Sequence, residues 1–315
     1  MIDVKKVLIS SFLLGCSWTG FSMTEEEQMA MYELPQETKE IYEEQFERGT
    51  DEAFEAVDEL QVVLVVDYSG SNMVRDEHPI DPSKVRGMLT VKKEELSPRL
   101  PEQHKISMSG DYWRRWDSVF FIAKNMYDAM KEIDDDGEIP CYFFGNTVHK
   151  EVINSKFKML RAFKDKKVSP TNLEQTDLYA ALKQAIWDHK DAIDSNKKVL
   201  FVVLTDGQPF TSYMGKEAQE RGIEQLIYNE LSTKDPNGER LNVFFVRVGD
   251  DKGAKEFLAR IDDLDEDKAG PAVGKNVDTK SDNWVHKHGP KVSLANAITE
   301  EYEKMPGFEI TEELE

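Results

Sequence analysis

The chain has 315 residues, of which 39% are hydrophobic and 32% charged, and its formal net charge is −21. This length suffices for one large domain or two modest ones, and the composition is typical of a globular protein with acidic extensions. The acidic excess argues against non-specific nucleic-acid binding, which depends on clustered lysine and arginine. The two cysteines, Cys16 and Cys141, lie far apart, so a disulfide framework and a cysteine-based zinc motif are both excluded.

Residues 1–22 have the features of a secretory signal. Two lysines precede a short apolar run, Val7–Leu14, which is too short to span a bilayer but fits the hydrophobic part of a signal peptide. The run ends in LLGC, which resembles the lipobox of bacterial lipoproteins and implies that Cys16 is lipidated. We therefore expect a membrane-anchored lipoprotein that faces out of the cytoplasm. The alternative is a cytoplasmic protein with a buried strand here or with its true start at Met23.

Two further segments differ from the rest of the chain. Residues 23–60 combine dense Glu and Asp with spaced apolar residues, which predicts an acidic helical extension divided by Pro35. The stretch at about 72–112 contains four prolines and reads as a long insertion. Loops of this length inside a compact domain are usually functional or disordered, so we interpret this one as a candidate lid over the nearby site.

From residue 61 onward, apolar runs alternate with amphipathic segments. Strands are predicted at 62–66, 139–144, 148–153, 199–204 and 242–248. Helices are predicted at 113–133, 158–167, 178–186, 216–232, 253–263 and 292–304, the third with Thr176 as its N-cap. This alternation predicts an α/β domain over 61–305, followed by an acidic tail at 306–315. We expect a doubly wound, mostly parallel central sheet with helices on both faces and one antiparallel edge hairpin.

Several polar residues have less specific patterns. The run Asp134–Asp136 lacks the spaced ligands of an EF-hand and is interpreted as a solvated turn. His286 and His288 are expected at the surface. Trp113, Arg114, Arg115 and Trp116 could form a contact patch, but this composition also fits a helix start packed on the sheet.

The most informative stretch is VVLVVDYSGS, residues 62–71. Its apolar half reads as a strand buried on both faces, so Asp67 is the first polar group at the carboxyl end, where ligands bind in open α/β sheets. Asp67, Ser69 and Ser71 could turn toward one point and form an oxygen cradle for a small divalent cation. The alternative is a polar turn between strand and helix. The strand at 199–204 also ends in polar groups, Thr205 and Asp206.

The order of these motifs resembles the von Willebrand factor A (vWA) family. DYSGS at 67–71, Thr176 at the start of TDLYAAL, and Thr205-Asp206-Gly207 match its metal-ion-dependent adhesion site in sequence and approximate separation. The likeness covers about residues 60–280, and DDDGEIPCYFFG is closest to bacterial and phage vWA proteins of the tellurium-resistance type. The resemblance implies a Rossmann-like vWA fold with strand order 3-2-1-4-5-6, which would place Asp67 and Asp206 on neighbouring strands.

The resemblance also assigns roles within the site. Ser69 and Ser71 would ligate Mg²⁺, or Mn²⁺ or Ca²⁺, directly, while Asp67 and Asp206 would act through water. Thr176 would join the ligands when a partner is bound, and a carboxylate of a protein partner would complete the shell. Each residue also has an ordinary structural role available, in a turn or a helix cap.

The segment before Thr176 departs from the family pattern. Glu174 and Gln175 replace the usual glycines there, which leaves the approach of this loop to the metal open. Thr171 is a weaker alternative to Thr176, because the TDLYAAL helix start belongs to Thr176.

These features favour a non-enzymatic, cation-dependent protein-binding module. One alternative is a metal-dependent phosphohydrolase, although Ser69 stands where haloacid-dehalogenase-type enzymes need a second aspartate. Another is a metal-free scaffold in which the candidate lid or the acidic helices contact the partner. The sequence does not identify the partner, the preferred ion or the oligomeric state.

Overall fold

The structure is a computed structural model that describes residues 60–73, 75–77, 112–134, 136–165, 175–195, 197–235, 240–262, 264 and 276–299. The predicted signal and anchor, the acidic extension up to residue 59, the acidic tail and Thr171 lie outside these ranges. Most of the candidate lid, residues 78–111, also lies outside them. Within the described ranges, no helix has the length and apolarity that crossing a membrane requires.

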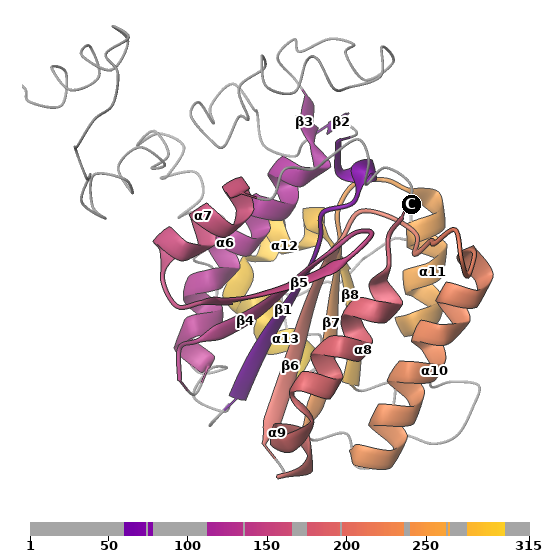
Figure 1. Ribbon diagram of the computed structural model, residues 1–315. Coiled ribbons are helices and arrows are strands. Elements are labelled where there is room, and N and C mark those ends of the chain that lie inside the picture. Colours follow the sequence, from indigo (N-terminus) through magenta and orange to yellow (C-terminus); the bar gives the residue numbers. More distant parts are fainter. Residues whose placement is uncertain are drawn as a thin grey trace, which may run out of the picture.

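A six-stranded sheet forms the centre of the molecule (Figure 1). Its strands are β1 (Leu60–Asp67), β4 (Ile139–Phe144), β5 (Val148–Ile153), β6 (Lys198–Thr205), β7 (Leu241–Arg247) and β8 (Val277–Ser281). The order across the sheet is β5-β4-β1-β6-β7-β8, which is 3-2-1-4-5-6 in order along the chain. All neighbours pair in parallel except β4 and β5, which form the expected antiparallel hairpin. The predicted mostly parallel α/β sheet is therefore confirmed.

Helices pack on both faces of this sheet because successive residues of β1 point to opposite sides. Val62, Leu64 and Val66 enter one hydrophobic cluster, and Val63 and Val65 enter the other. The first cluster is completed by α6 (Arg115–Ile133), α7 (Lys156–Asp165), α12 (Asp282–His288) and α13 (Pro290–Thr299). The second is completed by α8 (Leu178–Asp188), α9 (Lys190–Asp194), α10 (Lys216–Lys234) and α11 (Lys252–Asp262). Burial on both faces explains the unbroken apolar run that predicted β1.

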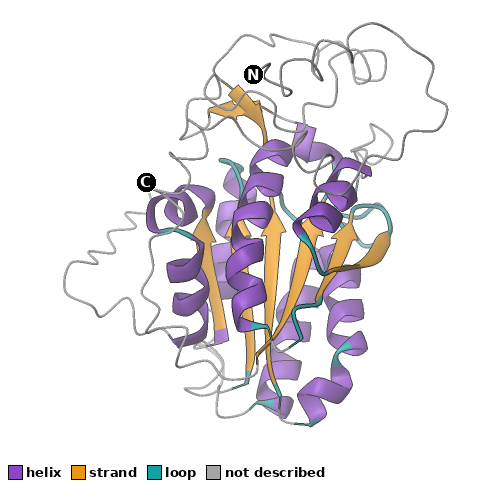
Figure 2. Cartoon of the chain, turned by 90° about the vertical axis from the view of Figure 1, so that its left-hand side faces the viewer, coloured by secondary structure: helices purple, strands orange, loops and turns teal. Residues whose placement is uncertain are grey.

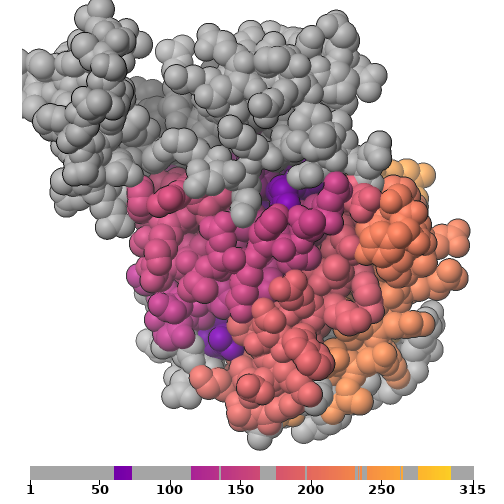
Figure 3. All heavy atoms as spheres, in the orientation of Figure 1, coloured from indigo at the N-terminus to yellow at the C-terminus, as the bar shows by residue number. Residues whose placement is uncertain are grey.

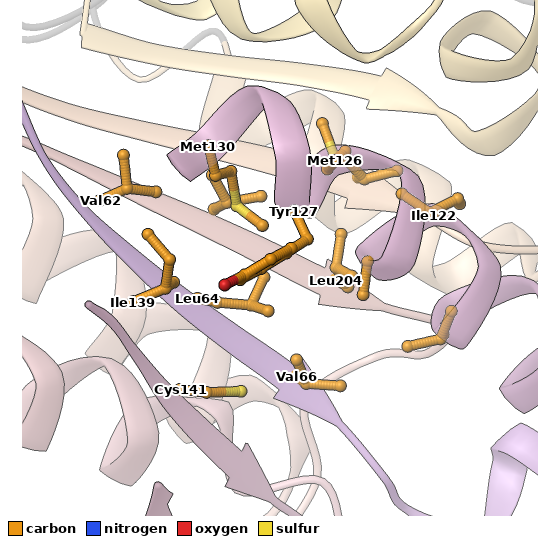
Figure 4. Close-up of a cluster of buried hydrophobic side chains, with 14 of the residues drawn as sticks. Val62, Leu64, Val66, Ile122, Met126, Tyr127, Met130, Ile139, Cys141 and Leu204 are labelled. Carbon is orange, nitrogen blue, oxygen red and sulfur yellow. The ribbon is translucent and has the colours of Figure 1, made fainter. Parts of the chain in front are cut away.

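Figure 4 shows part of the first cluster, where Tyr127 of α6 points toward Leu64 of β1, with Ile139 and Cys141 of β4 nearby. Cys141 is fully buried, as expected for a small apolar side chain. Each Leu, Val or Phe fully buried in this way contributes about 1.5–3 kcal/mol relative to leaving it exposed. The core therefore fixes β1, and with β1 the position of the polar residues that follow it.

The two ends of the candidate lid form secondary structure that the sequence analysis did not predict. Residues 70–73 form a 3₁₀ helix, η1 (Gly70–Met73), followed by β2 (Arg75–Glu77). This strand pairs antiparallel with β3 (Tyr112–Arg114), which leads directly into α6. Figure 2 shows the parallel strands pointing toward the end of the molecule where this two-stranded ribbon lies. Helix α6 therefore begins two residues later than the predicted helix at 113, and Trp116 packs in the core rather than in a surface patch.

Three local predictions are wrong. The N-cap of α8 is Asp177, whose carboxylate accepts the N–H of Ala180, and not Thr176. Asp134 is not solvated, because it is buried and accepts the backbone N–H of Val62 at 2.8 Å. His286 is buried on α12, which packs against β7, β8, α6 and α13.

Candidate functional site

The candidate site lies where β1 and β6 end. These strands are parallel neighbours, with Val66 opposite Leu204, so Asp67 and Asp206 leave the same edge of the sheet. The Thr205 hydroxyl donates to Oδ2 of Asp67 at 2.8 Å and links the two strand ends. In the space-filling view, atoms of the indigo segment that includes β1 and η1 are visible at this end of the molecule (Figure 3).

Four of the five predicted site residues are joined by short hydrogen bonds. The N–H of Ser69 donates to Oδ1 of Asp67 at 2.8 Å. The Ser69 and Ser71 hydroxyl oxygens are 2.8 Å apart, and the Ser71 hydroxyl donates to Oδ1 of Asp206 at 2.8 Å. A hydroxyl carries one hydrogen, so Ser71 has to accept from Ser69 when it donates to Asp206. The two serine hydroxyls therefore link the Asp67 turn to the carboxylate of Asp206.

The 3₁₀ helix η1 folds the two serines toward Asp206. The backbone N–H of Asn72 donates to the carbonyl oxygen of Ser69 at 3.2 Å and closes the turn. A Cβ placed on Gly207 would lie 3.5 Å from the Ser71 hydroxyl oxygen, an ordinary van der Waals distance, so the Asp206 loop packs directly beside Ser71.

Asn72 is a site residue that was not recognised in the sequence. Its amide nitrogen donates to the backbone carbonyl of Asp67 at 3.1 Å and to Oδ1 of Asp206 at 3.0 Å. Its amide oxygen is buried and has no hydrogen-bond partner within the described structure. Buried polar atoms are normally satisfied, so this oxygen can accept from a water or a ligand at the site. The only sequence signal was its place directly after DYSGS at 67–71.

The electrostatics of the site are dominated by two buried acids. Asp67 and Asp206 are both fully buried. Burial raises the pKa of Asp67 above its ordinary value, against the opposing hydrogen bonds from Ser69 and Thr205. Burial also raises the pKa of Asp206 well above its ordinary value, and the Asp67 charge raises it further. A nearby positive charge therefore stabilises the ionised form of both carboxylates.

Arg115 supplies one such charge. It is the first residue of α6, and its Nη1 lies 3.4 Å from Oδ2 of Asp206 and 3.3 Å from the Asp206 carbonyl oxygen. Its side chain is only 11% exposed, and it lowers the pKa of Asp206 against the effects of burial and of Asp67. The sequence indicated a helix start here but gave no reason to connect Arg115 with Asp206.

Thr176, the fifth predicted residue, lies in the loop beside the other four. Its backbone pairs with Phe210 through two hydrogen bonds, of 2.7 and 3.1 Å, which ties it to the segment that follows Asp206. The next N–H, of Asp177, donates to the carbonyl oxygen of Gly145, and a Cβ on Gly145 would lie 3.8 Å from the Cα of Ser69. No described hydrogen bond joins the Thr176 hydroxyl to the other four residues. Thr176 therefore neighbours the cluster without being part of its hydrogen-bond chain.

The donor set suits a hard cation. The two carboxylates, two hydroxyls and one unpartnered amide oxygen supply only oxygen donors, which Mg²⁺, Mn²⁺ and Ca²⁺ prefer. Within the described ranges, no group of three or more His, Cys, Asp and Glu side chains is placed to hold a metal. The candidate site has two such residues and would depend on hydroxyls and water for the remaining ligands. Arg115 beside Asp206 is the feature that fits least well with a bound cation.

Comparisons with known proteins add little to this picture. No protein-family model and no curated protein matches the chain. Among solved structures, it is similar to proximal thread matrix protein 1 from the mussel byssus, at 13% identity and a TM-score of 0.39, over 76% of this chain and 48% of that one. The chain thus spans about half the length of the mussel protein.

Two further solved structures are similar over most of their own length. One is an aerotolerance-related membrane protein from Bacteroides fragilis, at 14% identity and a TM-score of 0.34, over 78% of this chain and 100% of that one. The other is the N-terminal domain of TFIIH p34, at 9% identity and a TM-score of 0.37, over 77% and 98%. Likenesses this distant carry no argument about function.

Proposed function

We propose that the chain contains a doubly wound, Rossmann-like domain of the vWA type that binds a divalent cation and, through it, an acidic group of a protein partner. In this proposal Ser69 and Ser71 supply hydroxyl oxygens to the ion, and Asp67 and Asp206 act through water. Thr176 joins when the partner carboxylate is bound. The ion supplies the positive charge that attracts the partner, and the domain performs no chemical reaction.

The observation that carries this proposal is the hydrogen-bonded chain from Ser69 through Ser71 to Asp206, beside the buried Asp67. Two buried carboxylates at one edge of a sheet are costly to ionise, and the raised pKa values of both reflect this cost. A divalent cation offsets both charges at once, and serine hydroxyls provide neutral oxygen ligands beside it. The strand order supports the same proposal because it places the two acids at the point where the strand order reverses.

Exposed aromatic side chains near the site support a protein partner. Phe210, which pairs with Thr176, is 43% exposed, and Tyr213 is 65% exposed. The Tyr213 hydroxyl donates to the carboxylate of Asp177, which holds the ring beside the start of α8. Aromatic residues are enriched at the contacts that contribute most to protein binding. A partner that offers a carboxylate to the ion could pack apolar groups on these two rings.

One observation favours a second candidate, a metal-free interaction scaffold. Arg115 already contacts Asp206 and can neutralise it without a metal. In that case the serines would only shape a turn, and the exposed aromatic residues would contact the partner without an ion.

Titration calorimetry with MgCl₂ and with MnCl₂ distinguishes the two candidates. The cation-dependent module predicts saturable binding with one ion per chain, which Ser71→Ala weakens strongly. Ser195→Ala, a serine outside the site on the exposed surface, serves as the control and should bind like the wild type. Capture of a partner should then be lost in EDTA and in Asp67→Ala. Partner capture that persists in EDTA would instead establish the metal-free scaffold.

A further inference from the structure

A cationic side chain already lies against the candidate metal site. Nη1 of Arg115 contacts both Oδ2 and the backbone carbonyl oxygen of Asp206, at 3.4 and 3.3 Å. The Arg115 side chain is 11% exposed and the Asp206 side chain is fully buried, so water screens this contact poorly. A divalent cation that approaches Asp206 therefore meets a positive charge within the same small volume.

We propose that Arg115 is a built-in competitor of the divalent cation. Its guanidinium neutralises Asp206 when the metal is absent and moves away from Oδ2 when the metal binds. This inference rests on the proposed cation site and adds a residue that sets the affinity of that site.

A count of charges explains why the two cations exclude one another. When both are ionised, Asp67 and Asp206 together carry two negative charges. One guanidinium leaves one of them uncompensated, whereas one divalent ion compensates both. A divalent ion and the guanidinium together would leave one excess positive charge in a buried site, where charge–charge energies are largest. The exchange of one cation for the other avoids that state.

The two oxygens of Asp206 are already divided between two surroundings. Oδ1 accepts from Ser71 and Asn72, on the side of the proposed ligands. Oδ2 faces Arg115. The guanidinium can therefore leave Oδ2 without breaking the hydrogen bonds that hold Oδ1 to η1. The departure of Arg115 also releases the contact between its Nη1 and the carbonyl oxygen of Asp206.

The location of Arg115 connects this exchange to the neighbouring ribbon. Arg115 directly follows β3, and β3 pairs with β2, which begins two residues after η1 ends. The 3₁₀ helix η1, which carries Ser71, also packs against α6 (Figure 1). Arg115 thus directly follows β3, and Ser71 lies in the 3₁₀ helix just before β2, so the competitor and one proposed ligand flank the same two-stranded ribbon.

The competition is tested with Arg115→Gln, which removes the charge and retains a side chain that can donate a hydrogen bond. The control is Arg221→Gln, on the exposed surface of α10, which removes one positive charge away from the site. Titration with MgCl₂ should show binding to Arg115→Gln that is tighter by about tenfold or more, and unchanged binding to Arg221→Gln. In EDTA, Arg115→Gln should unfold at a lower temperature than the wild type, and Mg²⁺ should raise its Tm by more.

The outcomes separate the competition from the site itself. If Arg115→Gln binds Mg²⁺ no more tightly than the wild type, while Ser71→Ala abolishes binding, the competition is overturned and the cation site stands. If neither the wild type nor Arg115→Gln shows saturable binding of Mg²⁺ or Mn²⁺, the cation site fails, and the competition fails with it. If Arg115→Gln binds Mg²⁺ and the wild type does not, Arg115 is a competitor strong enough to exclude the ion.

A second measurement applies if Arg115→Gln does not fold. In wild-type protein labelled with ¹⁵N-arginine, the Nε–H signal of Arg115 is identified by its loss in Arg115→Lys. Saturation with MgCl₂ should shift this signal, because the guanidinium leaves Asp206. A signal that stays in place while the protein binds Mg²⁺ would overturn the competition.

Discussion

The Thr205 hydroxyl donates a hydrogen bond of 2.8 Å to Oδ2 of Asp67, which joins the ends of β6 and β1. The other carboxylate oxygen of Asp67 accepts the N–H of Ser69 at the same distance. Both oxygens of a fully buried acid are thus held by donors from two different strand ends. Hydrogen bonds from Thr205 and Ser69 therefore fix the orientation of the Asp67 carboxylate.

Replacement of Thr205 by valine should destabilise the protein, because it removes one donor from a buried carboxylate and keeps the side-chain shape. The expected loss is about 1–3 kcal/mol in the free energy of unfolding, measured by urea denaturation in EDTA. Thr205→Ser retains the hydroxyl and should lose less. Equal stability of the valine variant and the wild type would show that the hydrogen bond does not hold Asp67.

The run of aspartates after α6 allows a matched comparison. Asp134 is buried and accepts the N–H groups of Val62 and Gly137, each at 2.8 Å, whereas Asp136 is exposed. Asp134→Ala leaves the Val62 N–H without its acceptor inside the protein and should cost about 1–3 kcal/mol in urea denaturation. Asp136→Ala should change the free energy of unfolding by less than about 0.5 kcal/mol. Similar losses in both variants would refute the role assigned to Asp134 in fixing the start of β1.

His189 should make the stability of the protein depend on pH. It is buried against Tyr142 and Phe201, and burial lowers its pKa from 6.5 to about 4. The unfolded chain binds the proton of His189 more tightly than the folded chain does. The stability that the buried neutral His189 contributes is therefore complete above pH 6.5 and is lost as the pH falls toward 4. Between pH 7 and pH 5 the wild type should lose about 2 kcal/mol more than His189→Gln in urea denaturation.

The comparison with His189→Gln is needed because Asp282 changes stability in the opposite direction. Burial raises its pKa from 3.8 to about 6, so between these values the folded chain keeps a proton that the unfolded chain releases, and stability falls as the pH rises. The difference between wild type and His189→Gln cancels this effect. An equal loss in both proteins on acidification would exclude His189 as the cause.

The lipid anchor predicted at Cys16 stays a prediction, because residues 1–22 lie outside the described structure. Incorporation of labelled palmitate into the full chain in a bacterial host should occur in the wild type and be absent from Cys16→Ser. Label retained in Cys16→Ser would contradict the lipobox interpretation.

The features that the sequence predicted correctly depend on local patterns or on a general rule of sheets. An unbroken apolar run identified β1, and the polar groups after β1 and β6 marked the edge where parallel strands end. The strand order that the vWA resemblance implies connected Asp67 with Asp206 across 139 residues, counted from 67 to 206, and the observed order agrees with it. Cys141 was correctly placed in the core because its neighbours form an apolar strand.

The features that the sequence did not reveal depend on packing between distant elements. Strand β8 was missed because it is polar, with only two of its five residues buried. Arg115 reaches Asp206 because α6 starts close to the end of β6, and no local sequence pattern encodes that contact. Thr176 and Asp177 can each cap a helix; in the structure α8 begins at Leu178 and Asp177 caps it, while the backbone of Thr176 pairs with Phe210.

An anomalous difference map from crystals grown with MnCl₂ tests the central claim most directly. The account predicts one strong peak at the end of β1 and β6, in direct contact with the hydroxyl oxygens of Ser69 and Ser71, with the Arg115 guanidinium moved away from Asp206. Absence of a peak there at a saturating manganese concentration, with Arg115 still on Asp206, would contradict it.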